Sequence, residues 1–244
     1  MIRLVKVISH SGLCSRREAE KLIINGDVQL EGKIYKNYVI EPNLINKITI
    51  KGEKLKLQPT RLWLLHKSVG LICSNSNQYN KKTIFEVLPK SLPRVVSVGR
   101  LDINSEGLIL LTNNPTLSTF LENPKNNIPR KYRVKIHGEI ERNKIQFLSK
   151  EFEIDNTKYK PFIIKIILKD KKFSELEIII SEGKNREIRK ALKFLKVKII
   201  VLKRVDYGPF KLLNIKVNEL CEVEKNELDR KLLSIGFKNE NHLW

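Results

Sequence analysis

Apolar residues in the first 58 positions recur at helical spacing before they give way to short alternating runs. The first helix that this pattern predicts carries Leu4, Val7 and Ile8 on one face, and Gly12 is placed to end it. The pattern therefore indicates a small folded unit at the start of the chain, with a helix whose apolar face points into the core.

A second helix is expected over residues 15–27. Ser15 and Glu18 have the spacing of a capping box, in which each side chain accepts a hydrogen bond from a backbone amide of the other residue. Gly26 suits the left-handed conformation that commonly ends a helix. Local chemistry thus predicts both ends of this helix.

Strands are expected after the two helices. Residues 28–35 are typical of a hairpin that turns at Glu31-Gly32, and residues 47–52 are typical of a further strand. Pro59-Thr60 is expected to be a linker. Together with the helices, these strands indicate a small α/β domain over residues 1–58.

The rest of the chain mixes strands and helices without the regular alternation of a parallel sheet. Leu108 to Leu111 form a continuous apolar run, which is typical of a strand buried on both faces. We therefore expect an α+β domain with a mainly antiparallel mixed sheet over residues 61–235. A loose tail is expected over residues 236–244, in which Trp244 could dock. The expected strands are residues 62–75, 108–111, 131–138, 162–168, 175–181 and 198–208, and the expected helices are residues 82–89, 116–123 and 185–195.

The charge balance narrows the class of partner. The 244 residues include 47 Lys and Arg against 27 Asp and Glu, which gives a net charge of +20 and an isoelectric point near 9.8. Such an excess is most simply explained by binding to a polyanion such as nucleic acid. A lysine-rich proteome is the alternative explanation, because Ile and Asn are abundant as well.

Composition disfavours several classes of protein. The chain has no run of 18 apolar residues, so we expect no membrane span, and its start lacks the core of a signal peptide. Cys14, Cys73 and Cys221 are sparse and far apart, as in proteins of a reducing cytoplasm. The four histidines are equally scattered, so no metal site is expected. We expect a cytoplasmic protein, with a monomer as the default.

Arg16 and Arg17 fall in the first turn of the second predicted helix. Cations there oppose the positive end of the helix dipole, at a cost of roughly 0.3–1 kcal/mol each. A bound phosphate would offset this cost, which favours contact with RNA. If both side chains point into water instead, the cost is screened and no contact follows.

The densest basic stretch is residues 181–204, with nine cations against two acids. In the helix expected there, Ile188, Ala191, Leu192 and Leu195 lie at the spacing of a buried stripe. The stretch therefore combines a helix that packs on a core with a strongly positive outer surface.

Arg186, Lys190 and Lys193 are expected on the outer face of that helix. Arg189 lies at the edge of the buried stripe, where its stem can be buried while its guanidinium reaches inward toward a carboxylate. A membrane-surface helix is the competing interpretation, but Phe194 is the one large aromatic residue near the stripe.

The stretch GRLDINSEGLILLTNN sets a lone carboxylate, Asp102, ahead of the apolar strand. Residues 102–113 partly match a calcium loop, although Asn113 stands where the twelfth position should be Glu. Asp102 and Glu106 could form a glycosidase pair, but a loop does not oblige them to face each other. An Asp that caps a local turn is the structural alternative.

The remaining interpretation is a catalytic carboxylate in a basic site that faces RNA. Arg100, and Arg189 if it reaches inward, would keep Asp102 ionised at neutral pH. An ionised Asp is fit to act as a nucleophile or as a base.

Several segments of the sequence resemble those of a known family, the bacterial ribosomal RNA pseudouridine synthases of the RsuA/RluB group. VGRLDINSEGLILLTNN resembles its signature, LLHKSVGLICSN its Lys-Pro-x-Gly strand, RKYRVKIHG its Lys-x-Tyr strand and SEGKNREIRKALKFL its Gly-x-x-Arg-x-Ile-Arg segment. SHSGLCSRREAEKLIINGDVQLEGK resembles the alpha-L RNA-binding motif at the start of these proteins. The segments follow the family's order over residues 3–210, so the set is specific. RVDYGPF resembles the RluB-like branch, which acts on the large subunit.

The resemblance implies a pseudouridine synthase fold and the isomerisation of a specific uridine in ribosomal RNA, with large-subunit RNA favoured. It implies ribosomal RNA or a pre-ribosomal particle as partner, and no metal, small-molecule cofactor or membrane. The catalytic residues that it implies are Asp102, Tyr132, which would stack on the uracil, and Arg189, which would pair with the aspartate. The expected substrate-binding residues are Arg100, Leu101, Ile188 and Leu202 around the flipped nucleotide, together with Arg16, Arg17, Lys184 and Arg186.

Three departures from the family pattern concern local geometry. Ser68 stands in place of a proline, Arg130 in place of a lysine, and Asn114-Pro115 in place of Asp-Gly.

Two other functions stay open. A non-enzymatic ribosomal RNA binding or assembly factor would not need an ionised Asp102. A regulatory mRNA or DNA binder would need a recognition helix, and no dimerisation element is apparent.

Overall fold

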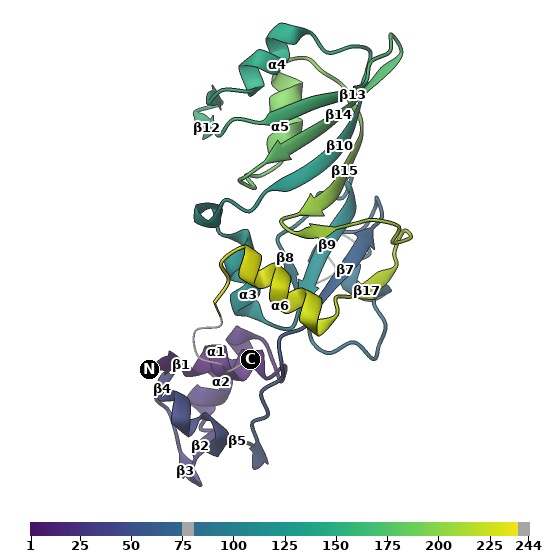
Figure 1. Cartoon of the computed structure of the whole chain (residues 1–244). Helices are drawn as coiled ribbons and strands as arrows, with labels where there is room; N and C mark the ends of the chain where they lie inside the picture. The colour runs from purple at the N-terminus through teal and green to yellow at the C-terminus, as the bar shows by residue number, and fades with distance from the viewer. Residues whose placement is uncertain (75–80, 239–244) are drawn as a thin grey trace.

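The computed structural model describes residues 1–74 and 81–238 as an elongated molecule with a small N-terminal unit at one end (Figure 1). A nine-stranded sheet runs through the rest, and helices cover it at two separate places (Figure 1). Asn75, expected in a strand, and Trp244, which could dock, lie outside the described residues.

The N-terminal unit packs helices α1 (Leu4–His10) and α2 (Arg16–Asn25) against a four-stranded sheet. The capping box of α2 is confirmed, since Ser15 and Glu18 each accept a hydrogen bond from the other's amide. Gly26 ends the helix in the left-handed conformation. The sheet has the order β3 (Lys33–Ile34), β2 (Val28–Leu30), β5 (Ile48–Ile50) and β6 (Glu53–Lys54), while β1 (Ile2–Arg3) pairs with β4 (Val39–Ile40) and a 3-10 helix η1 spans Pro42–Lys47.

The large sheet is antiparallel except where β9 and β15 run parallel. This confirms the expected α+β class with a mainly antiparallel sheet. The main order is β13 (Ile163–Leu168), β14 (Phe173–Ile180), β10 (Arg130–His137), β15 (Ile199–Tyr207), β9 (Glu106–Thr112), β7 (Leu62–Lys67) and β17 (Leu220–Glu222), with β8 (Val96–Val98) on β9 and β16 (Phe210–Lys211) on β15.

Strand β9 is buried on both faces, as its continuous apolar run predicts. Leu108 and Leu110 join one core, under α3 (Pro115–Glu122) and α6 (Lys225–Ser234). Ile109 and Leu111 join a second core on the opposite face. The strand is therefore the layer that two hydrophobic cores share, and its position is fixed from both sides.

A third core lies under the other end of the sheet. There, β10 and β14 are covered by two helices, α4 (Arg142–Leu148) and α5 (Glu187–Phe194), and by the hairpin of β11 (Phe152–Ile154) and β12 (Thr157–Tyr159) (Figure 1). Ile188, Ala191 and Leu192 are buried in this core, which confirms the apolar stripe of α5.

Three predicted elements need correction. The strand expected over residues 62–75 ends at Lys67, because the chain turns at Gly70, whose φ is +93°. The helix expected over residues 185–195 begins at Glu187, because Arg186 takes a left-handed conformation with φ +52°. The helix expected over residues 82–89 is the 3-10 helix η2 (Ile84–Val87).

The linker between the two parts is bound to the end of β9. Asn113 accepts a hydrogen bond from the Arg61 amide at 2.8 Å and donates one to the carbonyl of Pro59 at 2.8 Å. Asn114 donates to Thr60 Oγ1 at 2.8 Å and also caps the N-terminus of α3. Asn113 and Asn114, which directly follow β9, thus hold the linker in place, and Asn114 also begins helix α3.

The first part of the predicted tail is packed. Phe237 lies edge-on to Phe120 of α3, with ring centroids 5.1 Å apart.

Among the helices of residues 1–74 and 81–238, none has both the length and the apolarity that a membrane crossing requires.

A glycine is required where the parallel strands meet. Gly107 of β9 has φ +115°, and a Cβ placed on it would lie 2.2 Å from the carbonyl oxygen of Arg204 in β15. That separation is far inside van der Waals contact. The close approach of β9 and β15 therefore depends on the missing side chain.

We expect Gly107→Ala to lower the free energy of unfolding by about 3 kcal/mol or more, because both φ strain and a backbone clash result. Chemical denaturation of the full chain measures this loss. Gly70→Ala is the matched control, since its φ is +93° but no atom lies within 4 Å of the added Cβ. Equal losses in both variants would contradict the close-contact explanation.

Candidate active site

A cavity of about 150 Å³ lies where the loop before β9 meets β10, β15 and the start of α5. A space of this size holds one six-membered ring. Nine of the eleven residues expected at the site from the sequence line it, namely Asp102, Tyr132, Arg189, Arg100, Leu101, Ile188, Leu202, Lys184 and Arg186.

Asp102 begins a tight turn that a buried cation holds from below. The amide of Ser105 donates to the carbonyl of Asp102 at 2.9 Å and closes the turn. The Lys67 ammonium, fully buried, donates to the carbonyls of Asp102 at 3.2 Å, Ser105 at 2.8 Å and Ser68 at 2.9 Å. Burial lowers the pKa of Lys67. The turn is thereby tied to the end of β7.

Arg189 holds the same turn from the opposite side. Its Nε lies 3.4 Å from Asp102 Oδ2, and its terminal nitrogen donates to the carbonyl of Asn104 at 2.8 Å and to Ser105 Oγ at 3.0 Å. Burial lowers the pKa of Arg189, and the charge of Asp102 opposes that shift. The edge position of Arg189 on α5 and its inward reach toward a carboxylate are as the sequence predicts.

The expected pairing of Arg100 with Asp102 is not formed. Arg100 lines the cavity but is exposed, and no ion pair joins it to Asp102 within residues 1–74 and 81–238. Among the described residues, Arg189 is therefore the one that forms an ion pair with this carboxylate. The position of Arg100 at the rim suits contact with a phosphate better than contact with Asp102.

Tyr132 and three apolar side chains form the walls of the cavity. Tyr132 lies in β10 opposite Ile178 of β14 and is 8% exposed. Leu101 lies in the loop before β9, Ile188 in α5 and Leu202 in β15, and all three are buried. A planar ring can therefore enter against Tyr132 while apolar surfaces cover its other sides.

Two buried arginines that the sequence analysis did not place in the site lie behind these walls. Arg130 donates to the carbonyls of Ile128 and Leu121 and to Tyr207 Oη at 2.9 Å. Arg204 donates through Nε to the carbonyl of Leu108 at 2.7 Å. Both guanidinium groups are held by neutral oxygens, so they make the interior of the site positive.

Lys67 and Cys73 were also missed. The Cys73 thiol contacts the amide of Leu101 at 3.4 Å and its carbonyl at 3.5 Å, and so fixes the residue before Asp102. Burial raises the pKa of the Cys73 thiol, which keeps it protonated. A lysine at the end of a strand that begins with four apolar residues, as in LWLLHK, is the signal that could have identified Lys67.

Two carboxyl groups organise the loop before α5. Glu187, almost fully buried, accepts a hydrogen bond from the amide of Lys184, and Glu182 accepts one from the amide of Lys160. Burial, followed by the nearby charge of Glu182, raises the pKa of Glu187 to about 8. The side chain of Lys184 pairs with Glu182 at 2.8 Å. The loop that carries Lys184 and Arg186 is thus held by acidic groups from beneath.

Arg16 and Arg17 lie elsewhere. Both are exposed in the first turn of α2, in the N-terminal unit and outside the cavity.

No three His, Cys, Asp or Glu side chains within the described ranges 1–74 and 81–238 gather closely enough to hold a metal ion. Asp102, the first position of the calcium-loop interpretation, is paired with Arg189 instead.

Comparison with known proteins gives the chain two matching families. The RNA pseudouridylate synthase family matches residues 61–194, and the S4 domain matches residues 2–44. An uncharacterised RNA pseudouridine synthase of Rickettsia typhi is 39% identical to this chain, over 98% of each. The ribosomal large subunit pseudouridine synthase B of Bacillus subtilis is 30% identical, over 94% of this chain and 95% of its own.

A solved pseudouridylate synthase structure superposes with a TM-score of 0.67 at 24% identity, over 95% of this chain and 100% of that one. The likeness shows that the two share a fold. Because the family match spans more than half of the sequence and the relatives align along nearly all of it, this chain belongs to the RNA pseudouridylate synthase family, whose members are isomerases, and it carries an S4 domain at its N-terminus.

Proposed function

We propose that this enzyme converts one specific uridine of ribosomal RNA to pseudouridine, and that its substrate is large-subunit RNA. Relatives from Bacillus subtilis and Buchnera aphidicola are named ribosomal large subunit pseudouridine synthase B, which supports this choice. The net charge of +20 suits an RNA substrate. The observation that carries the proposal is Asp102, held 3.4 Å from Arg189 at a cavity that fits one base.

Asp102 is the proposed catalytic residue. Arg189 pairs with the carboxylate and aims it, while Lys67 fixes the backbone that carries it. The carboxylate attacks the base or the sugar, or removes a proton from the sugar, and each route needs the same charged group in the same place. The glycosidic N1–C1′ bond breaks and a C5–C1′ bond forms within one nucleotide, while C5 loses a proton and N1 gains one. The isomerisation therefore needs no second substrate, metal or cofactor.

The target uridine is expected to flip out of its stack and enter the cavity, since its reacting atoms are inaccessible inside a stack. Tyr132 supplies a stacking surface worth roughly 1–3 kcal/mol. Leu101, Ile188 and Leu202 cover the rest of the base. Three cations at the mouth, Arg100, Lys184 and Arg186, are proposed to contact the RNA backbone.

We assign residues 1–58 to RNA binding, residues 61–235 to catalysis, and residues 236–244 to a C-terminal tail. Arg16 and Arg17 are the proposed phosphate contacts of the S4 domain, because both are exposed at the start of α2. We further propose that the enzyme works as a monomer in the cytoplasm, on ribosomal RNA or a pre-ribosomal particle.

Asp102→Ala should abolish turnover and leave RNA affinity within a few-fold, because the carboxylate does the chemistry and contributes little to binding. The measurement is carbodiimide-adduct primer extension across unmodified ribosomal RNA transcripts treated with each protein. Wild type should add one new stop in large-subunit RNA, and the variant should add none.

Asp229→Ala is the matched control, since Asp229 is exposed on α6. Normal turnover by Asp102→Ala would refute the catalytic assignment. Tight binding without a stop on either ribosomal RNA would favour the non-enzymatic assembly factor instead.

The double variant Arg16→Gln with Arg17→Gln should weaken RNA binding and flatten its salt dependence. Each lost phosphate contact reduces the slope of log affinity against log salt by about 0.7–0.9. Removing cations from the start of α2 does not destabilise that helix, so weaker binding would not reflect unfolding. Fluorescence anisotropy at several salt concentrations gives the slope. An unchanged slope would show that α2 does not contact the RNA.

A further inference from the structure

A second hollow, of about 440 Å³, lies beside the catalytic cavity along the outer side of α5. We call it the α5 groove. Arg186 and Arg189 line both spaces, so the groove adjoins the place where the target base is proposed to enter. Its other lining residues are Lys190, Lys193 and Phe194 on α5, and Ile154 and Asp155 on the β11–β12 hairpin.

An exposed aromatic ring forms one end of the groove. Phe194 is 53% exposed and stacks on Phe147 of α4, with ring centroids 5.9 Å apart and planes inclined by 26°. Phe147 in turn packs on Phe152 at 5.4 Å, and Phe152 packs edge-on against buried Phe162 at 5.2 Å. A chain of rings thus runs from the core to the surface and supports the outermost ring from below.

The cations of the groove are available to an external anion. No salt bridge within residues 1–74 and 81–238 involves Arg186, Lys190 or Lys193. Four cations and one carboxylate, Asp155, line the groove, so its potential is positive. An exposed, supported aromatic ring beside unpaired cations is the arrangement that binds single-stranded nucleic acid, in which rings stack on bases and cations contact phosphates.

We propose that the α5 groove binds the nucleotide next to the target uridine, with its base stacked on Phe194 and its phosphate against Lys190 and Lys193. This inference rests on the proposed function. A uridine that flips into the cavity leaves its neighbour without a stacking partner, which costs a few kcal/mol. The neighbour emerges at the edge that the cavity shares with the groove. Stacking on Phe194 replaces the lost contact, so the groove helps to keep the target flipped.

Phe194→Leu should weaken binding to an unmodified large-subunit ribosomal RNA transcript on the order of tenfold, because an apolar side chain remains but its stacking surface is lost. The concentration of RNA for half-maximal turnover should rise similarly. Phe194→Trp should restore wild-type binding. Leu233→Ala, an exposed apolar change on α6, should have no effect.

Wild-type affinity in Phe194→Leu would overturn the proposal. Failure of Phe194→Trp to restore binding would also overturn it, because the loss would then reflect packing of α5. The same variants are tested on phosphatidylglycerol vesicles. If the variants lose binding to vesicles but keep wild-type binding to RNA, the α5 groove is a membrane-binding surface and the RNA assignment is overturned. If wild type binds the transcript but never modifies it, the proposed function fails, while the affinity comparison still decides the role of the groove.

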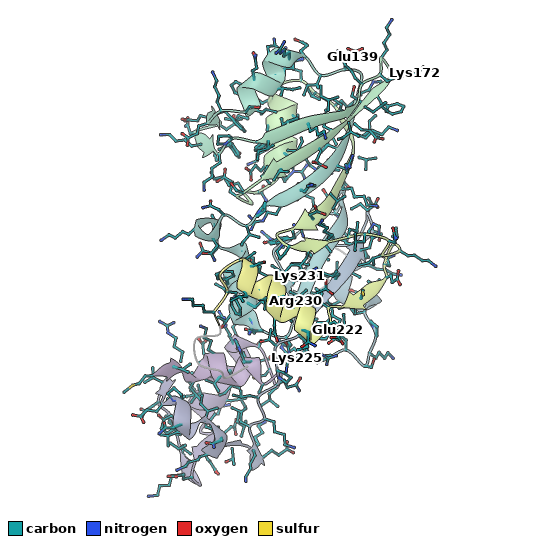
Figure 2. All side chains as sticks on the ribbon, viewed as in Figure 1. Glu139, Lys172, Glu222, Lys225, Arg230 and Lys231 are labelled. Carbon is teal, nitrogen blue, oxygen red and sulfur yellow. The ribbon has the colours of Figure 1, made fainter. Side chains whose placement is uncertain are left out.

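The cations are tested separately by Lys190→Gln with Lys193→Gln in the full chain. Because both lysines are placed against one phosphate, their loss should reduce the salt slope of RNA binding by about 0.7. Lys225→Gln with Arg230→Gln is the matched control, because Figure 2 shows both residues on α6, away from α5 as placed in Figure 1. An equal change in slope in both double variants would mean that the groove contributes only general charge, and would overturn its assignment as a nucleotide site.

Discussion

The site depends on one buried ammonium. Lys67 stands at the end of β7 and binds the carbonyls at both ends of the Asp102–Ser105 turn. A buried cation without such oxygens would be costly, so the turn and the lysine stabilise each other. Arg189 completes the arrangement from the solvent side, through the side chain of Asp102 and the carbonyl of Asn104. The direction of the carboxylate therefore follows from hydrogen bonds to backbone atoms on two sides of the turn.

Positive charge acts in two different ways in this molecule. Arg130 and Arg204 are buried and bound to neutral oxygens, so dissolved salt screens them little and they act on whatever enters the cavity. Arg16, Arg17 and Lys193 face water, where salt screens them strongly. Attraction of RNA to the surface should therefore depend on ionic strength much more than the electrostatics around Asp102 do.

Local patterns predicted much of this architecture. The capping box of α2, the double burial of β9 and the stripe of α5 each follow from spacing within one element. Helices α4 and α6 and the β11–β12 hairpin were missed, although Leu228 and Leu232 give α6 a weak helical pattern. Spacing placed Arg189 where it could reach inward toward a carboxylate, and the family resemblance implied its pairing with Asp102. That Arg100 does not share this pairing could not be read from spacing, because it depends on how α5 meets the β9 loop.

The length of strand β9 also sets the distance between the loop of Asp102 and the linker to the S4 domain. Asp102 lies in the loop before it, and Asn113 and Asn114 hold the linker to the S4 domain just after it. Seven extended residues span roughly 23 Å. The loop that carries Asp102 and the attachment point of the S4 domain thus lie at the two ends of one stiff strand, which two hydrophobic cores share. Under the proposed function, an RNA that engages both must itself bridge that separation, so the strand would set the distance between the target uridine and a second feature of the folded RNA.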